Sequence, residues 1–273
     1  MTNRWGKWIA IVGMGLVAFS FLYPFLWMFV ATIKPEKEIT EVGLLASQYS
    51  LDNYRVLLDR IPILRALLNS FIVAVTSTVS VLIFCSLAGY ALARLRFPGR
   101  GLIHNLILFT MVMPFQLTLI PLYVMMVKFG WVDTYAALIL PYSMSAFAIL
   151  LFRQFFLQMP QDLIDAARID GLGELSILFR IFWPLSKPIL ITVGIVHFMG
   201  IWNEALWPLI VIRDEMLMTM PQMVALFAVA GQAEGQFGVQ LSAAALMTLP
   251  VVIVFVFLQR YFIESMATSG LKE

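Results

Sequence analysis

One carboxylate stands inside an otherwise apolar segment in the last third of the chain. Glu204 follows Trp202 and Asn203 within the stretch from Pro188 to Ile212. An acid at the centre of a membrane helix costs about 2.5–3.5 kcal/mol on insertion scales, so such residues are rare and commonly functional. Indole faces stack on sugar rings, and Asn or Glu side chains hydrogen-bond to hydroxyl groups. One hypothesis is that these three residues, together with Gln116, line a translocation path. The alternative is an aromatic belt in which a polar side chain reaches the membrane interface.

A second group of polar residues forms an island between apolar segments, at about residues 159–188. Pro160 is suited to the first turn of a helix, and Gly171 to the position just past its end. The roughly ten residues between them predict a helix of about 15 Å. Ala166 and Ala167 leave part of this helix without bulk, so that another surface can approach its backbone. A second short helix is expected after the glycines, and the two together form a rigid knob suited to insertion into a partner.

Several kinds of chemistry have no motif in this sequence. There is no Gly-x-x-x-x-Gly-Lys-Ser/Thr loop, so the chain is not expected to hydrolyse ATP itself. No His pair or Cys cluster has the spacing of a metal site. His104 and His197 stand alone, and Cys85 is expected to be a packing residue. We therefore expect a non-catalytic chain with no metal and no cofactor of its own.

The composition is that of an integral membrane protein. Of 273 residues, 61% are hydrophobic and only 12% are charged, whereas a soluble domain averages about 45–50% and about 25% respectively. The net charge of +2 is small, and the basic residues form short clusters beside apolar segments. That pattern indicates membrane orientation and contact with lipid, not nucleic-acid binding.

Six apolar stretches have about the twenty residues needed to cross a bilayer. They run approximately from Trp8 to Ile33, Asn69 to Leu92, Leu102 to Met125, Val132 to Phe152, Pro188 to Ile212 and Val239 to Tyr261. Pro114 and Pro121 break the third stretch, and Pro141 lies in the fourth. The sequence therefore predicts an all-α integral membrane protein, with six transmembrane helices in one domain of residues 1–273.

Lysine and arginine set the expected orientation through the positive-inside rule. The residues assigned to the cytoplasmic side are Arg4, Lys7, Arg94, Arg96, Arg100, Arg153, Arg168, Arg180, Lys187, Arg260 and Lys272. The short connections on the other side hold only Lys128 and Arg213. The loop from Lys34 to Arg65 carries five basic and five acidic residues, and the even number of spans places it outside, as one or two short helices. Both termini and the polar island are thus expected in the cytoplasm.

The spacing within the island carries a family resemblance. Asp165-Ala166-Ala167 and Gly171, followed by Pro184-Leu185 and Pro188, resemble the EAA loop of ABC importer permeases, with Asp165 where that family usually has Glu. Further likenesses are Pro24-Phe25-Leu26-Trp27-Met28, Asn69-Ser70, Tyr90-Ala91-Leu92-Ala93-Arg94, Phe97-Pro98-Gly99, Pro114, Pro121-Leu122-Tyr123, Trp202-Asn203 and Gln259-Arg260-Tyr261. The chain is similar to the smaller permease subunit of maltose-type and glycerol-phosphate-type importers, in the carbohydrate-uptake branch. That resemblance implies the fold of a type I ABC importer permease.

The resemblance also implies a function and a set of partners. Such permeases form heterodimers in a bacterial or archaeal cytoplasmic (inner) membrane and bind two ATPase subunits, which hold ATP and Mg. A binding protein outside the cytoplasm delivers the substrate. This chain would then import a carbohydrate or related polyol by alternating access. The residues that would couple it to the ATPase are Asp165, Ala166, Ala167, Asp170 and Gly171. The alternative is a gradient-driven secondary transporter acting alone, for which Glu204 is the one candidate ion-coupling residue.

Overall fold

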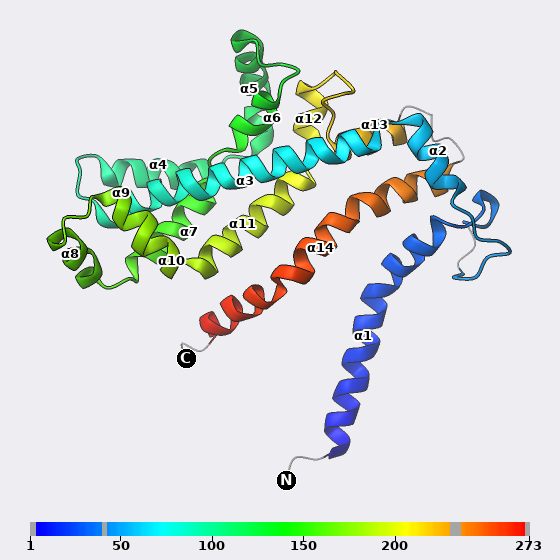
Figure 1. The fold of residues 1–273 in the computed structure, drawn as a ribbon, viewed down its shortest axis with the longest axis horizontal. Coiled ribbons are helices and arrows are strands. Elements are labelled where there is room, and N and C mark those ends of the chain that lie inside the picture. The colour runs from blue at the N-terminus through cyan, green and yellow to red at the C-terminus, as the bar shows by residue number, and fades with distance from the viewer. Residues whose placement is uncertain (1–3, 40–42, 230–235, 271–273) are drawn as a thin grey trace. The chain divides into compact units, whose positions relative to one another are not determined.

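The computed structural model describes residues 4–39, 43–229 and 236–270, and the regular elements in these ranges are helices (Figure 1). In chain order they are α1 (Arg4–Ala31), α2 (Asp52–Arg60), α3 (Ile63–Arg94), α4 (Arg100–Val112), α5 (Phe115–Phe129), α6 (Tyr135–Ile139), α7 (Ala146–Leu157), α8 (Gln161–Ile169), α9 (Glu174–Ile177), α10 (Trp183–Leu185), α11 (Lys187–Trp202), α12 (Leu206–Val211), α13 (Met220–Val229) and α14 (Phe237–Gly270). Two 3₁₀ turns, Glu36–Glu38 and Leu140–Tyr142, and a π-helical segment, Leu178–Phe182, lie between them. The predicted all-α class is confirmed.

The helices group into two compact units. The first unit comprises Met1–Leu64 and Met223–Pro250, and the second comprises Arg65–Gln222 and Val251–Glu273. The polar island and Glu204 both belong to the second unit. That unit therefore carries the candidate functional residues.

Within the first unit, the polar loop after α1 forms the short helix predicted for it. The Asn53 side chain, from α2, donates hydrogen bonds to the backbone carbonyls of Thr32 at 2.8 Å and Lys34 at 3.1 Å. The carboxylate of Glu36 accepts hydrogen bonds from the backbone N–H groups of Phe237 and Gly238, the latter at 3.0 Å. These groups have no partner within α14, because the first N–H groups of a helix lie beyond its ladder of hydrogen bonds. Glu36 thus caps the helix.

Among the described residues, three helices are long and apolar enough to cross a membrane, and three bent pairs raise the number of candidate spans to as many as six. The three single helices are Gly6–Ala31, Ile63–Arg94 and Phe237–Phe257. The bent pairs are α4 with α5 at 104°, Tyr135–Tyr142 with α7 at 42°, and Glu174–Leu185 with α11 at 86°. The predicted continuous segment from Pro188 to Ile212 was wrong, because α11 ends at Trp202 and the chain breaks before α12.

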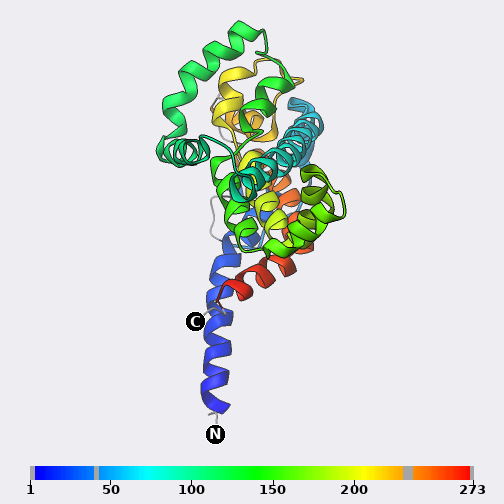
Figure 2. The same cartoon turned by 90° about the vertical axis from the view of Figure 1, so that its left-hand side faces the viewer.

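Proline explains the sharpest of these bends. Pro114 precedes α5 with φ −61° and ψ 133°, and the residue before it, Met113, is also extended. Proline disfavours the helical region for the preceding residue and donates no backbone hydrogen bond, so a helix ends there. Figure 1 and Figure 2 show the resulting turn, from which α5 leaves the direction of α4.

In the second unit, α3 shares a hydrophobic core with α7, α8 and the π-helical segment. Its buried face carries small side chains, including Ala74, Ser77 and Cys85. A Cβ atom added at Gly89 would lie 2.6 Å from the Cβ of Phe152, so α3 and α7 approach each other too closely there for any side chain. Small residues at helix contacts allow this kind of approach in membrane proteins. This close contact lies near the C-terminal end of α3, where Arg94 contacts the start of α8.

Candidate functional site

The polar island begins with a short helix whose two ends are set by its sequence. Pro160, extended at φ −60° and ψ 138°, precedes α8. After α8, Gly171 has a φ of +79°, which favours glycine. The N–H of Gly171 donates to the carbonyl of Arg168, and that of Leu172 to the carbonyl of Ala167, both at 3.0 Å. This pair of bonds is a Schellman motif, so the start and end predicted for this helix are confirmed.

One face of α8 is buried against the rest of the second unit. Ile164 is fully buried and Ala167 is 4% exposed, as expected for residues three apart on a helix. Both belong to a core that also contains Phe156 and Phe182. The expectation that Ala167 lies open to a partner was wrong, because this alanine packs against the chain's own core. Ala166 is exposed, as expected.

The opposite face of α8 is exposed and mixed in character. Asp165 and Asp170 are exposed there beside Ala166. Ile169 is 86% exposed, which is unusual for a large apolar side chain within a polar segment. No role was predicted for this isoleucine from the sequence. Its position three residues after Ala166, on the side away from Ile164, was the signal that could have identified it.

Asp165 is held by local contacts. Its Oδ1 accepts a hydrogen bond from Gln161 Nε2 at 3.0 Å and lies 3.8 Å from the Arg168 guanidinium. Arg168 in turn contacts Glu174, with distances of 2.9 Å from Nε and 2.8 Å from Nη2 to Oε1. The hydrogen bond that Arg168 donates to the Glu174 carboxylate raises the pKa of Arg168. Asp165 and Glu174 thus orient the side chain of Arg168, and Asp165 remains exposed at the edge of this network.

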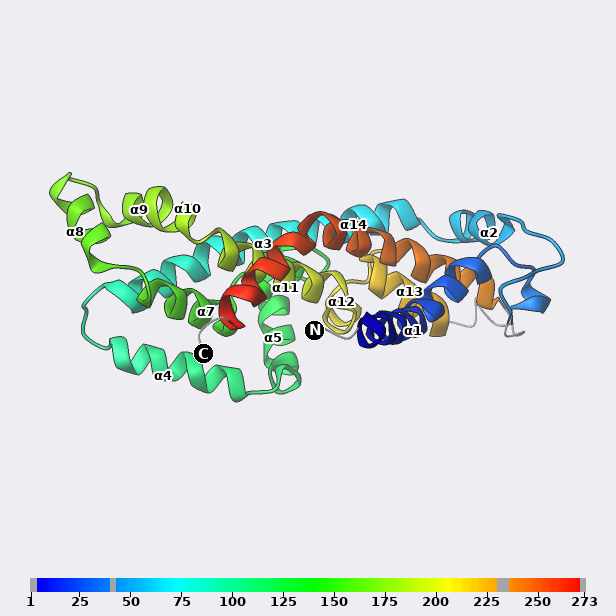
Figure 3. The ribbon, with the colours of Figure 1, turned by 90° about the horizontal axis from the view of Figure 1, so that it is seen from below.

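The second helix of the island, expected after the glycines, is present but irregular. It runs as α9, the π-helical segment and α10. Pro184 cannot donate to a carbonyl four residues back, and a π-helical turn relieves the conflict that proline creates in a continuing helix. Figure 3 shows α8, α9 and α10 together at one end of α3, so the expected knob of two short helices is confirmed.

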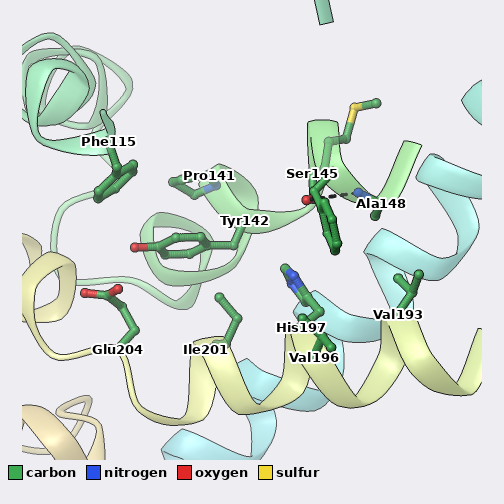
Figure 4. Close-up of a pocket in the computed structure, with 13 residues that line it drawn as sticks. Phe115, Pro141, Tyr142, Ser145, Ala148, Val193, Val196, His197, Ile201 and Glu204 are labelled. Atoms are coloured by element: carbon green, nitrogen blue, oxygen red, sulfur yellow. Dashed lines mark hydrogen bonds between the residues drawn. The ribbon is translucent and has the colours of Figure 1, made fainter. Parts of the chain in front are cut away.

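A second candidate site is a pocket of about 400 Å³ within the second unit (Figure 4). Its lining residues come from α5, from the 3₁₀ turn Leu140–Tyr142 and α7, and from α11 and the turn that follows it. They include Phe115, Tyr142, Ser145, His197 and Glu204. In Figure 4 the hydroxyl of Tyr142 and the carboxylate of Glu204 point toward each other across the pocket. The volume falls within the range of about 300–1,000 Å³ usual for small-molecule sites.

Glu204 lies where the backbone leaves the helix, not within it. Asn203 is the C-cap of α11, and Glu204 Oε1 accepts a hydrogen bond from the N–H of Trp207, at the start of α12, at 3.1 Å. Trp207 is fully buried and donates from Nε1 to the carbonyl of Ala137 at 2.8 Å. This anchored tryptophan fixes the break between α11 and α12. The carboxylate is thereby held at the wall of the pocket.

The structure separates the four residues predicted to line one path. Glu204 lines the pocket, but Trp202 does not, because it is 1% exposed and its ring stacks on Phe198 at 5.7 Å. The expectation that the Trp202 indole is available to a sugar ring was therefore wrong. Asn203 is exposed and donates to the carbonyl of Met199 at 2.8 Å. Gln116 is exposed on α5 and is not among the residues lining the pocket.

The pocket also contains Tyr142 and His197, for which the sequence predicted no path-lining role. The Tyr142 hydroxyl and His197 Nε2 are buried and have no hydrogen-bond partner in the part of the chain that the structure describes. Buried polar groups are normally paired, so such atoms beside a pocket are available to a ligand. The ring of Phe115 lies 5.9 Å from that of Tyr142 and closes one side. No local pattern in the sequence joins these residues, because they meet only through tertiary packing.

Comparison with known proteins identifies the family. Residues 85–268 match the family described as "Binding-protein-dependent transport system inner membrane component". The chain is 33% identical over 271 residues to the arabinooligosaccharides transport system permease protein AraQ of Halalkalibacterium halodurans, covering 97% of this chain and 96% of that protein. It is 33% identical to the lactose transport system permease protein LacG of Rhizobium radiobacter, covering 94% and 93%. It is 32% identical to the sn-glycerol-3-phosphate transport system permease protein UgpE of Brucella abortus, covering 98% and 97%.

A solved structure has the same fold. A chain in the crystal structure of a bacterial ABC transporter involved in the import of the acidic polysaccharide alginate superposes with a TM-score of 0.80 and 26% identity, over 96% of this chain and 99% of that one. The protein therefore belongs to the family of inner-membrane permease components of binding-protein-dependent transport systems. The resemblance to ABC importer permeases drawn from the island residues is confirmed.

Proposed function

We propose that this chain is the permease subunit through which an ATP-driven importer moves a carbohydrate or related polyol into the cytoplasm. Relatives similar over almost their whole length are named for arabinooligosaccharides, lactose and glycerol phosphate, all of which carry several hydroxyl or phosphate oxygens. The proposal rests on the knob of two short helices, with the exposed face of α8, in a chain of this family. Alternating access then requires the ATPase to favour one packing of the membrane helices over another.

The partners follow from this proposal. The chain pairs with a second permease subunit, two ATPase subunits hold ATP and Mg, and a binding protein delivers the solute from the other side of the membrane. Both termini and α8 face the cytoplasm, which agrees with the excess of Lys and Arg near these segments. The exposed face of α8, with Ile169 and Ala166 flanked by Asp165, docks on the ATPase. An apolar side chain among small and charged neighbours is a suitable anchor for a partner groove.

The pocket is part of the solute path. Glu204 accepts hydrogen bonds from sugar hydroxyls, and the unpaired polar atoms of Tyr142 and His197 add a donor and a further polar contact. Phe115 offers an apolar face at the pocket wall. Polar groups that have no protein partner favour a ligand able to hydrogen-bond with them, since burial without a partner costs free energy.

The energy source that drives uptake distinguishes this function from that of a gradient-driven carrier. In proteoliposomes that contain the complete transporter, we expect uptake to require ATP on the side of α8 and the binding protein on the other side. Collapse of ion gradients by an uncoupler should leave the rate unchanged, and vesicles loaded with ADP serve as the control. Uptake that continues with ADP but stops with the uncoupler would instead support the gradient-driven carrier.

A further inference from the structure

The last two turns of α3 hold the polar island through Tyr90 and Arg94. These residues are four apart, so their side chains lie on one face of the helix. The Tyr90 hydroxyl donates a 2.5 Å hydrogen bond to Glu174 Oε2, and the other oxygen of this carboxylate accepts from Arg168 Nε at 2.9 Å. Glu174 therefore joins α3 to the second half of α8 through a single carboxylate.

Arg94 binds the beginning of α8. Its Nη2 donates to the carbonyl of Phe156 at 2.5 Å and to that of Met159, and its Nη1 donates to Gln161 Oε1 at 3.2 Å. These acceptors lie at the end of α7 and the start of α8. A planar guanidinium with several fixed donors is suited to hold such a turn. The two ends of α8 are thus fixed to one face of the same helix.

Aromatic packing makes this connection stiff. The Tyr90 ring lies edge-on to Phe156 at 6.3 Å and to Phe182 at 5.1 Å, and these two phenylalanines are 5.3 Å apart. The Arg94 guanidinium lies 5.9 Å from the centre of the Phe182 ring. Tyr90 is 3% exposed, and both phenylalanines are fully buried. Close-packed interiors have low compressibility and transmit strain, so a displacement of α8 is passed to α3.

The other end of α3 is also hydrogen-bonded to neighbouring segments. With 32 residues, the helix is about 48 Å long at 1.5 Å per residue. Near its beginning, Asn69 Nδ2 donates to the carbonyls of Met216 and Met218, both at 2.9 Å. Asn69 Oδ1 accepts from the Tyr135 hydroxyl at 2.6 Å. One helix thus connects the polar island to the segments around Tyr135 and Met216.

We propose that Tyr90 and Arg94 are positioning residues that pass the motion of α8 along α3 to the Asn69 end of the second unit. The proposal rests on the proposed function in one respect, that α8 docks on an ATPase. Because the Tyr90 side chain is buried, its hydroxyl does not itself touch the partner. Removal of the hydroxyl should therefore affect the transfer of motion and leave docking intact.

The variant Tyr90→Phe tests this proposal in the complete reconstituted transporter, because it keeps the packed ring and removes only the hydroxyl. We expect the ATPase to co-purify in normal amounts, while the solute imported per ATP hydrolysed falls about tenfold, as for a lost hydrogen bond to a charged group. Glu174→Gln should have a similar effect, and the double variant should be no worse than the more severe single one. Tyr123→Phe, which removes a hydroxyl from α5, should match the wild type.

Arg94→Lys tests the proposal independently, since it keeps the positive charge and loses the fixed set of guanidinium donors. This variant should lower the amount of solute imported per ATP hydrolysed and leave the ATPase bound. A normal ratio of transport to ATP hydrolysis in both Tyr90→Phe and Arg94→Lys would overturn the proposal. Loss of transport only in proportion to loss of bound ATPase would also overturn it, because the residues would then serve docking. A wild-type chain that never assembles with an ATPase would overturn the proposed function as well.

Discussion

Replacing Gly171 by valine is expected to uncouple the transporter while leaving the chain inserted in the membrane. The φ of +79° at this position is strained for most L-residues, and most of all for a β-branched one. The cost is about 1–3 kcal/mol, which shifts the local equilibrium about fivefold to 150-fold. The turn after α8 would change direction, and its exposed face would no longer fit the ATPase. Substrate-stimulated ATP hydrolysis in the reconstituted complex measures the effect.

Two neighbouring substitutions separate this backbone effect from steric bulk. A Cβ atom at Gly171 or at Gly173 would meet nothing within 4 Å. Gly173 has an ordinary extended conformation, with φ −77° and ψ 161°. Gly173→Val should therefore keep coupling, and Gly171→Asn should keep most of it, because asparagine tolerates the left-handed region. Normal substrate-stimulated ATP hydrolysis by Gly171→Val would show that the conformation of this turn is not needed.

Loss of the Glu204 side chain is expected to weaken transport about tenfold or more, measured as uptake over a range of solute concentrations. Glu204→Ala removes a charged acceptor from the pocket and the cap on the N–H of Trp207. Hydrogen bonds to charged groups contribute about 1.5–3 kcal/mol each. Glu204→Gln keeps an oxygen that can accept the hydrogen bond from the N–H of Trp207. A transport defect shared by both variants would therefore come from a lost contact with the solute, and not from a change in the break between α11 and α12.

Asn203→Ala is the matched control for Glu204, because Asn203 is exposed and does not line the pocket. We expect it to have near-normal uptake, whereas His197→Ala should share part of the Glu204 defect. An unchanged solute affinity and rate in Glu204→Ala would remove this residue from the path. The pocket would then be a packing feature of the second unit.

The sequence predicted the parts of the fold that depend on local rules. Pro160 and Gly171 marked the ends of α8 because proline and glycine restrict or permit particular backbone angles. Pro114 marked the break between α4 and α5 for the same reason. Long apolar stretches gave the candidate spans, since membrane thickness sets their length.

Other features could not be predicted because they depend on tertiary packing. The end of α11 at Trp202 has no proline or glycine in the following three residues and is fixed by the distant contact of Trp207 with Ala137. Ala166 and Ala167 look equivalent in sequence, yet only the packing of α8 decides which one is buried. The helix α13, Met220–Val229, is too short to be recognised as a span and was not expected. The bond between Tyr90 and Glu174 joins residues 84 apart in the chain.

Purification of this chain from its native membrane in mild detergent, followed by mass spectrometry, shows directly whether it belongs to an ATP-driven complex. We expect a second permease and an ATPase at comparable amounts, close to two ATPase subunits for each permease pair. A binding protein recovered with them would help to identify the solute. Recovery of the chain alone, stable and monodisperse, would contradict the proposed function and favour a carrier that works without an ATPase.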